Sequence, residues 1–231
     1  MSERVSAIIP AFNAADYLAW ATESVRSQSD TILEIIVVDD GSTDTTAQVA
    51  QSMPDVRYIR QENAGPAAAR NTGIRAAQGE FFSFLDADDL WAKGKLAAQL
   101  EVFQNYPEID LVAGQVEEFE TVAPCSGTHP TRTHGQRAYT VGALLIRRSG
   151  FFKVGWFDES LRSGEFIDWL SRAKAAGLRE HVLDQVVLYR RLHAHNTTRL
   201  AEDHQRHYLA TIRRHLERKR SAPDKRVGGT P

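Results

Sequence analysis

Residues 32–44 read ILEIIVVDDGSTD and combine a strand, a turn and the start of a helix. Ile32–Val38 is nearly all isoleucine, leucine and valine, which is typical of a strand buried on both faces of a parallel sheet. Gly41–Asp44 contains Gly, Ser, Thr and Asp, which favour a turn and a helix cap. A helix is therefore predicted from this turn through about Met53, and the stretch as a whole predicts one β-α unit.

Similar units precede and follow this stretch. The predicted strands of the first half are Val5–Pro10, Ile32–Val38, Val56–Arg60 and Phe81–Leu85. The predicted helices are one capped by Asn13, one ending near Met53, Ala67–Gln78 and Trp91–Gln104. Strands that alternate with helices favour βαβ units, and we expect an α/β fold with a doubly wound sheet.

The second half of the chain is less regular. Its predicted elements are the strands Leu111–Glu120, Gly142–Arg148 and Val182–Leu192, the helix Glu165–Ala176 and a surface loop over Thr121–Tyr139. We interpret residues 1–199 as a single domain and residues 200–231 as a separate basic helix and tail.

The composition is that of an ordinary globular protein, with 231 residues, 42% of them hydrophobic and 25% charged. A net charge of −2 gives no case for a nucleic-acid partner. Cys125 is the single cysteine, which excludes an internal disulfide framework and a cysteine-based zinc site. No apolar run approaches the ~18 residues that span a bilayer. Since the N-terminus also shows no signal peptide, a cytoplasmic protein is expected.

Charge is concentrated at the C-terminus. Residues 200–231 hold eight Lys or Arg and four Asp or Glu, a net charge of +4. Apolar residues at helical spacing among these bases predict an amphipathic helix. Such a helix either packs on the domain or lies on the surface of an anionic membrane.

Polar residues follow three of the four predicted strands in the first half: Pro10–Asn13, Asp39–Ser42 and Asp86–Asp89. Ligands of open parallel sheets bind beyond these carboxyl ends. The alternative is that each Asp or Asn caps the next helix, which is worth about 1 kcal/mol.

Capping does not explain three carboxylates at Asp86, Asp88 and Asp89, since one cap needs one acceptor. Two unit charges ~5 Å apart repel by roughly 3 kcal/mol at an effective dielectric of 20, which exceeds the gain from a cap. A divalent cation with oxygen ligands relieves this repulsion. We expect Mg²⁺ or Mn²⁺ held by Asp86 and Asp88 and completed by ligand phosphates.

Four motifs resemble those of the family 2 glycosyltransferases, inverting enzymes whose GT-A fold has a Rossmann-like mixed, mostly parallel sheet flanked by helices. They are VSAIIPAFN at Val5–Asn13, IIVVDDGSTD at Ile35–Asp44, NAGPAAARNTG at Asn63–Gly73 and GEFFSFLDADDLW at Gly79–Trp91. The resemblance implies transfer of a sugar from a nucleotide diphosphate-sugar, most commonly a UDP-sugar, to a hydroxyl of a saccharide, lipid-linked or peptide acceptor. It also implies a nucleotide-sugar half, residues 1–105, and an acceptor half, residues 106–199.

The resemblance assigns roles to residues of the first half. Pro10, Phe12 and Asn13 would hold the nucleotide, Asp39 and Asp40 would bind the base and ribose, and Arg70 would face the nucleotide. Asp86-Ala87-Asp88 matches the DxD motif, which contacts the ribose and the metal that bridges the diphosphate. This agrees with the charge argument for a cation.

The acceptor half departs from the family pattern at one position. Most members have Glu-Asp where this chain has Glu165-Phe166, and that Asp is the general base. Phe166 takes no proton, so we interpret Glu165 as a substitute base. Asp168 lies on the same helical face and is the other candidate to take the acceptor proton. The alternatives are a one-residue shift of the alignment, or Glu165 as a helix cap with Asp168 paired to Arg172.

Downstream, His193 or His195 would supply an imidazole to the metal, as some relatives do, or Arg190 or Arg191 would steady the departing diphosphate. The missing Asp also leaves a second function open, a nucleotide-sugar-binding or regulatory protein with impaired catalysis. A nucleotidyltransferase and a dinucleotide dehydrogenase are disfavoured, because Pro10–Asp16 contains no Gly, Arg or Lys. The oligomeric state remains open.

Overall fold

A computed structural model describes residues 4–28, 31–120, 140–161 and 163–192. The predictions for the loop Thr121–Tyr139, for His193 and His195, and for the basic tail fall outside these residues.

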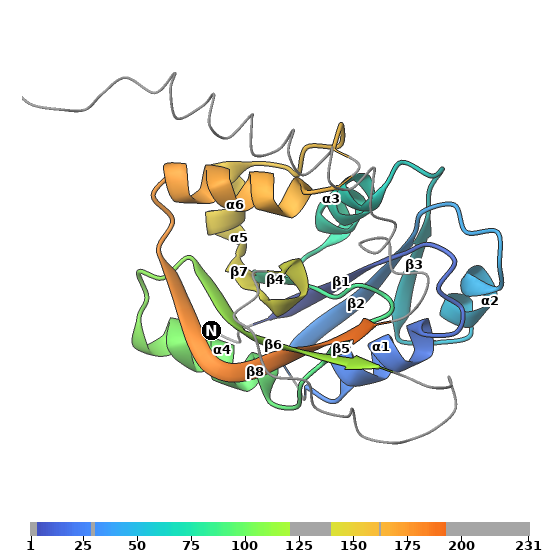
Figure 1. Ribbon diagram of the computed structural model, residues 1–231, viewed down its shortest axis with the longest axis horizontal. Coiled ribbons are helices and arrows are strands. Elements are labelled where there is room, and N and C mark those ends of the chain that lie inside the picture. Colours follow the sequence, from blue (N-terminus) through green and yellow to red (C-terminus); the bar gives the residue numbers. More distant parts are fainter. Residues whose placement is uncertain (1–3, 29–30, 121–139, 162, 193–231) are drawn as a thin grey trace, which may run out of the picture.

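The described residues form an eight-stranded sheet with the order β3-β2-β1-β4-β7-β6-β8-β5 (Figure 1). Its strands are β1 (Val5–Ala11), β2 (Ile32–Asp39), β3 (Val56–Arg60), β4 (Phe81–Phe84), β5 (Leu90–Trp91), β6 (Leu111–Glu120), β7 (Leu145–Arg147) and β8 (Glu180–Leu192). The pairs β1–β2, β1–β4, β2–β3 and β6–β8 are parallel, whereas β7 and β5 pair antiparallel with their neighbours. The predicted mixed, mostly parallel α/β sheet is confirmed.

Helices cover both faces of the sheet (Figure 1). They are α1 (Leu18–Arg26), α2 (Thr46–Gln51), α3 (Pro66–Ala76), α4 (Lys95–Asn105), α5 (Arg148–Val154) and α6 (Glu165–Ala175), with a 3-10 turn η1 (Val141–Ala143). Apolar residues of α1 and α4 are buried with one face of the sheet, and those of α3, α5 and α6 with the other. The α3 and α6 helices therefore share one side, which later brings their polar residues together.

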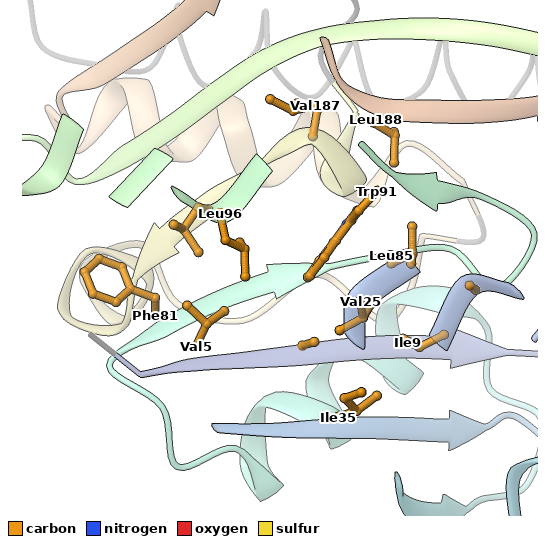
Figure 2. Packing of buried hydrophobic residues seen from close by; sticks show 14 of the residues in the cluster. Val5, Ile9, Val25, Ile35, Phe81, Leu85, Trp91, Leu96, Val187 and Leu188 are labelled. Atoms are coloured by element: carbon orange, nitrogen blue, oxygen red, sulfur yellow. The ribbon is translucent and has the colours of Figure 1, made fainter. Parts of the chain in front are cut away.

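The buried face beneath α1 and α4 is filled by large apolar side chains (Figure 2). Trp91 lies among Leu85, Leu96 and Leu188, and its indole Nε1 donates a hydrogen bond to the Phe84 carbonyl oxygen at 3.1 Å. Burial of each large apolar side chain is worth about 1.5–3 kcal/mol. The indole thus fixes the end of β4, directly before the acidic loop.

Gly73 allows α3 to approach the sheet closely. A Cβ atom at this position would lie 2.4 Å from Cγ2 of Ile8 on β1, which is closer than real side chains come. Any larger residue would push the helix away from β1. The glycine therefore sets how near Arg70, one turn earlier on α3, lies to the carboxyl ends of the strands.

The prediction of a helix over Trp91–Gln104 was wrong at its start. Trp91 belongs to β5 and pairs with Leu188 of β8, and α4 begins only at Lys95. Gly94 adopts a left-handed backbone conformation with φ +79°, which separates strand from helix. Tertiary burial of the indole outweighs the helical periodicity that extended the prediction.

Two further local predictions need correction. Gly142–Arg148 was predicted as one strand, but it contains the last two residues of η1, the short strand β7 and the first residue of α5. The α5 helix was not predicted; it buries Phe151, whose ring stacks on Trp169 of α6 at 5.3 Å. This apolar contact between distant residues supplies the stability that so short a helix lacks by itself.

Lys95 at the start of α4 is fully buried. Its Nζ donates to three neutral oxygen atoms, Ser83 Oγ at 2.8 Å, Gln99 Oε1 at 2.9 Å and the Leu144 carbonyl at 3.2 Å. The ammonium also lies 4.4 Å from the centre of the Trp91 ring. Burial lowers the pKa of Lys95 well below its usual range, because a low-dielectric surrounding disfavours the charged form.

We expect this lysine to make the free energy of unfolding vary with pH in the alkaline range. The unfolded chain keeps the proton up to a pKa of about 10.4, whereas the folded protein releases it at lower pH. The unfolding free energy therefore rises with pH between these two values, by at most about 1.4 kcal/mol per unit. Denaturant titrations from pH 7 to 10 should show a smaller rise in Lys95→Met than in the wild type. The exposed Lys93→Met is the control, and parallel slopes in all three proteins would contradict the effect.

Candidate functional site

Polar residues gather at the edge of the sheet where the parallel strands β1, β2 and β4 end. The β2 strand lies on one side of β1, and β4 lies on the other. The order of the strands in the sheet therefore reverses direction at β1. Such a reversal opens a crevice beyond the carboxyl ends, the usual ligand site of open α/β sheets. The predicted residues after β1, β2 and β4 all lie along this edge.

The loop after β1 places an exposed aromatic ring beside a structural asparagine. Phe12 is 52% exposed, although it is a large apolar residue. Asn13 has a left-handed backbone with φ +49°, and its Oδ1 accepts from the Thr43 backbone N–H at 2.9 Å. The prediction that Asn13 caps the next helix was wrong, because α1 begins at Leu18 and Asn13 instead holds the loop after β2. Pro10 lies on β1 opposite Val38.

Asp39, at the end of β2, is completely buried, and both of its carboxylate oxygens accept hydrogen bonds. Its Oδ1 accepts from the Ser42 N–H at 2.8 Å, and its Oδ2 from Tyr58 Oη at 2.7 Å and Arg60 at 3.0 Å. Burial opposes ionisation, but the hydrogen bonds from Ser42 and Tyr58 outweigh it and lower the pKa of Asp39. This carboxylate organises its own loop.

Asp40 fixes the segment that leads into α3. Its Oδ1 accepts from Gln61 Nε2 and from the Ala64 N–H, both at 2.8 Å. Its Oδ2 accepts from the Gly65 N–H at 2.8 Å, and Gly65 directly precedes α3. Asp40 therefore determines where α3 starts.

Arg70 on α3 joins two carboxylates that are far apart in the sequence. Its side chain is only 4% exposed. One terminal nitrogen donates to Asp86 Oδ1 at 2.7 Å, and the other donates to Glu165 Oε1 in a short hydrogen bond. Burial acts to lower the pKa of Arg70, but the charges of Asp86 and Glu165 prevail and raise it. Within the described part of the chain its buried Nε has no hydrogen-bond partner, which is unusual for a buried polar group.

Asp86 and Asp88 suit a cation that also binds a ligand. The Asp86 side chain is 44% exposed, and its Oδ1 is held by Arg70. Among the residues that the structure describes, no group of three or more His, Cys, Asp or Glu side chains could hold a metal alone. Mg²⁺ and Mn²⁺ often take one or two carboxylates and complete their shell with phosphate oxygens and water. The residues present fit that mode of binding.

Asp89 differs from its two acidic neighbours. It is buried, and its Oδ1 accepts from the backbone N–H of Arg191 at 2.8 Å. Burial, with the nearby charges of Asp88 and Asp86, raises the pKa of Asp89 well above its usual range. The three carboxylates grouped by the sequence argument therefore have separate environments.

The start of α6 shows the contacts of Glu165 and Asp168. Glu165 is the first residue of α6, after the N-cap Gly164, and its Oε1 accepts a hydrogen bond from Arg70. Asp168 is buried and accepts from Arg172 Nε at 2.9 Å, as the pairing alternative predicted. Phe166 packs into the apolar cluster with Trp169 and takes no part in a polar site. The structure thus brings Glu165, but not Asp168, into the Arg70–Asp86 cluster.

Sequence reasoning missed the partners that organise these residues. Tyr58 and Arg60, two apart on β3, both reach Asp39, and their spacing on a strand beside β2 was an available signal. The bridge from Arg70 to Glu165 joins residues 95 positions apart, and no local pattern signals it.

Comparison with known proteins places the chain in a family. The model described as Glycosyl transferase family 2 matches residues 6–157. An uncharacterized glycosyltransferase of Rickettsia felis is 41% identical over 185 residues, which cover 70% of this chain and 29% of that protein. A second one, from Rickettsia prowazekii, is 29% identical over 87% of this chain and 67% of its own length. This chain thus spans less than a third of the first relative.

Solved structures confirm the GT-A fold. Staphylococcus aureus TarS 1-349 in complex with UDP-GlcNAc has a TM-score of 0.75 at 21% identity, covering 93% of this chain and 66% of that one. The mannosyltransferase PcManGT from Pyrobaculum calidifontis, in complex with GDP-Man and Mn²⁺, has a TM-score of 0.70 at 21% identity, covering 91% and 64%.

None of the helices in the described ranges has the length and apolar character needed to cross a bilayer.

Proposed function

This chain belongs to glycosyl transferase family 2, and we propose that it transfers a sugar, with inversion, from a nucleotide diphosphate-sugar to an acceptor hydroxyl. Residues 1–105 would hold the sugar donor and residues 106–199 the acceptor. The acceptor would be a saccharide, a lipid-linked molecule or a peptide, and the basic tail would provide any contact with a membrane surface.

One observation carries this proposal. The buried guanidinium of Arg70 joins Asp86, in the loop after β4, to Glu165, at the start of α6. Asp86 lies in the candidate diphosphate and cation site, and Glu165 is the carboxylate proposed to face the acceptor. A transferase that acts on two substrates needs both groups within reach of one reacting carbon.

The sugar donor would lie along the carboxyl ends of β1, β2 and β4. The exposed ring of Phe12 offers a surface on which a base can stack, and Pro10 and Asn13 shape the same loop. Asp39 and Asp40 would bind the base and ribose of the donor through the lone pairs that their internal hydrogen bonds leave unused. Asp86 and Asp88, with His193 from the chain beyond β8, would bind Mn²⁺ or Mg²⁺. The cation, when bound, offsets the negative charge that grows on the departing diphosphate.

Glu165 would act as the general base. Its carboxylate accepts the proton of the acceptor hydroxyl while the acceptor oxygen bonds to the anomeric carbon of the sugar. The bond from that carbon to the diphosphate oxygen breaks, and its electron pair leaves with the nucleotide diphosphate. Attack opposite the leaving group inverts the configuration. The hydrogen bond from Arg70 goes to Oε1, and Oε2 would take the proton.

The choice of UDP over other nucleotides is supported by a structural neighbour. TarS was solved with UDP-GlcNAc, whereas PcManGT was solved with GDP-Man and Mn²⁺. We propose a UDP-sugar as the donor and Mn²⁺ or Mg²⁺ as the cation.

A second function is favoured by Phe166 alone. If the family's base is lost and Glu165 serves only to pair with Arg70, the chain binds a nucleotide-sugar without transferring it. Calorimetry and a donor-hydrolysis assay separate the two functions, because binding without turnover across a panel of acceptors fits only the second.

A thermal-shift screen with UDP and GDP, each with and without Mn²⁺, tests the donor site. A ligand that binds only the folded protein raises the unfolding temperature. At a concentration of 100 Kd, such a ligand adds about 2.7 kcal/mol to the free energy of unfolding. We expect the largest rise with UDP and Mn²⁺ together and a smaller one with either alone. No rise with any nucleotide would contradict the proposed function.

A further inference from the structure

Arg191, near the end of β8, is a buried arginine that reaches the acidic loop from the opposite half of the chain. Its residue exposure is 2%, and it is among the largest fully buried side chains. Burial lowers the pKa of Arg191, although the neighbouring charges oppose this shift. A cation so deeply buried is costly unless its surroundings stabilise it.

Aromatic rings provide that stabilisation. The guanidinium carbon lies 4.6 Å from the centre of the Phe119 ring, 5.0 Å from that of Tyr17 and 5.8 Å from that of Trp20. These rings come from β6 and from α1 with its preceding residue, so separate parts of the fold enclose the side chain. Cation–π attraction is strongest at such desolvated positions. The aromatic box therefore fixes the direction of the guanidinium.

From this box Arg191 makes two hydrogen bonds to the loop after β4. Its Nε donates to the Asp88 carbonyl oxygen at 2.8 Å, and its backbone N–H donates to Asp89 Oδ1 at 2.8 Å. The loop closes on itself through the Asp89 N–H, which donates to the Asp86 carbonyl at 3.0 Å. Arg191 thus holds the backbone at Asp88, one of the two proposed cation ligands, and the side chain of the next residue, Asp89.

We propose that Arg191 is a positioning residue that holds the Asp86–Asp89 loop in the conformation that binds a cation with a nucleoside diphosphate. This rests on the proposed function, since it concerns the same cation site. It replaces the idea that Arg191 contacts the diphosphate itself, because the buried side chain reaches the loop backbone. Arg190 differs: its side chain is 30% exposed and pairs with Glu118 at 3.1 Å.

The test compares Arg191→Lys with a matched variant, Arg147→Lys. Arg147 also lies near aromatic rings, Phe103 and Phe81, and its guanidinium donates to the carbonyl oxygens of Ile109 and Phe103. It pairs with Phe81 at the first residue of β4, so it lies at the end of that strand away from the acidic loop. Lysine keeps the charge in both variants but has no Nε–H at the required place.

The affinity of each protein for UDP in the presence of Mn²⁺ is measured by calorimetric titration, which is repeated with GDP. The unfolding temperature of each variant is measured as well. We expect both variants to unfold at lower temperature and only Arg191→Lys to bind the Mn²⁺–nucleotide pair at least tenfold more weakly. Affinity within twofold of the wild type in Arg191→Lys would overturn the inference, and so would an equal loss in Arg147→Lys. Lack of binding by the wild type would instead refute the proposed function, and the inference with it.

Discussion

Asp88→Asn is expected to reduce sugar transfer at least a hundredfold while the protein stays folded. Asp88 lies in the loop after β4, partly exposed, and replacing its carboxylate by an amide removes one negative charge from the proposed cation site. Loss of several kcal/mol of charge stabilisation in the transition state corresponds to about 10²-fold or more in rate. Transfer or donor hydrolysis is measured over a range of Mn²⁺ concentrations, with circular dichroism to verify the fold.

The exposed Asp184 on β8 provides the control, because Asp184→Asn makes the same chemical change on the surface. We expect Asp88→Asn to need more Mn²⁺ for half-maximal activity and Asp184→Asn to match the wild type. Unchanged turnover and an unchanged Mn²⁺ requirement in Asp88→Asn would refute the role of this carboxylate.

The first half of the fold was predictable because its local and tertiary preferences agree. Ile32–Val38 is β-branched and apolar, and the structure buries most of that strand between two helical layers. The same agreement holds for β1 and α3, whose apolar residues are buried. Where the two preferences conflict, prediction failed: Trp91 continues a helical pattern, yet its burial against β8 makes it a strand residue. Single-sequence patterns do not contain that long-range contact.

The candidate site was predictable in its residue types but not in its connections. Acidic residues after apolar strands indicated the edge of the sheet, because parallel strands end together. The pairing of Arg70 with Glu165 depends on α3 and α6 lying on the same face, which only the folded chain shows. The different surroundings of Asp86 and Asp89 likewise depend on Arg70 and Arg191, residues from other parts of the chain.

Glu165→Gln tests the substitution at the base position, and we expect kcat to fall by about 10²–10⁴-fold with little change in nucleotide binding. Glutamine keeps an oxygen that can accept from Arg70, so the connection to Asp86 is retained, but an amide takes no proton from the acceptor. Steady-state kinetics gives kcat and KM, and calorimetry with UDP and Mn²⁺ gives the affinity.

Asp168→Asn distinguishes the two carboxylates of α6. Asp168 is buried against Arg172, whose other nitrogens hold the carbonyl oxygens of Val154 and Trp156, so its loss should lower the unfolding temperature more than it lowers kcat. Full activity in Glu165→Gln together with a collapse of kcat in stably folded Asp168→Asn would reverse the assignment. If both variants bind the nucleotide and the wild type itself shows no turnover, the second function holds. Phe166 then stands where the family's base is lost, and the chain binds a sugar donor without transferring the sugar.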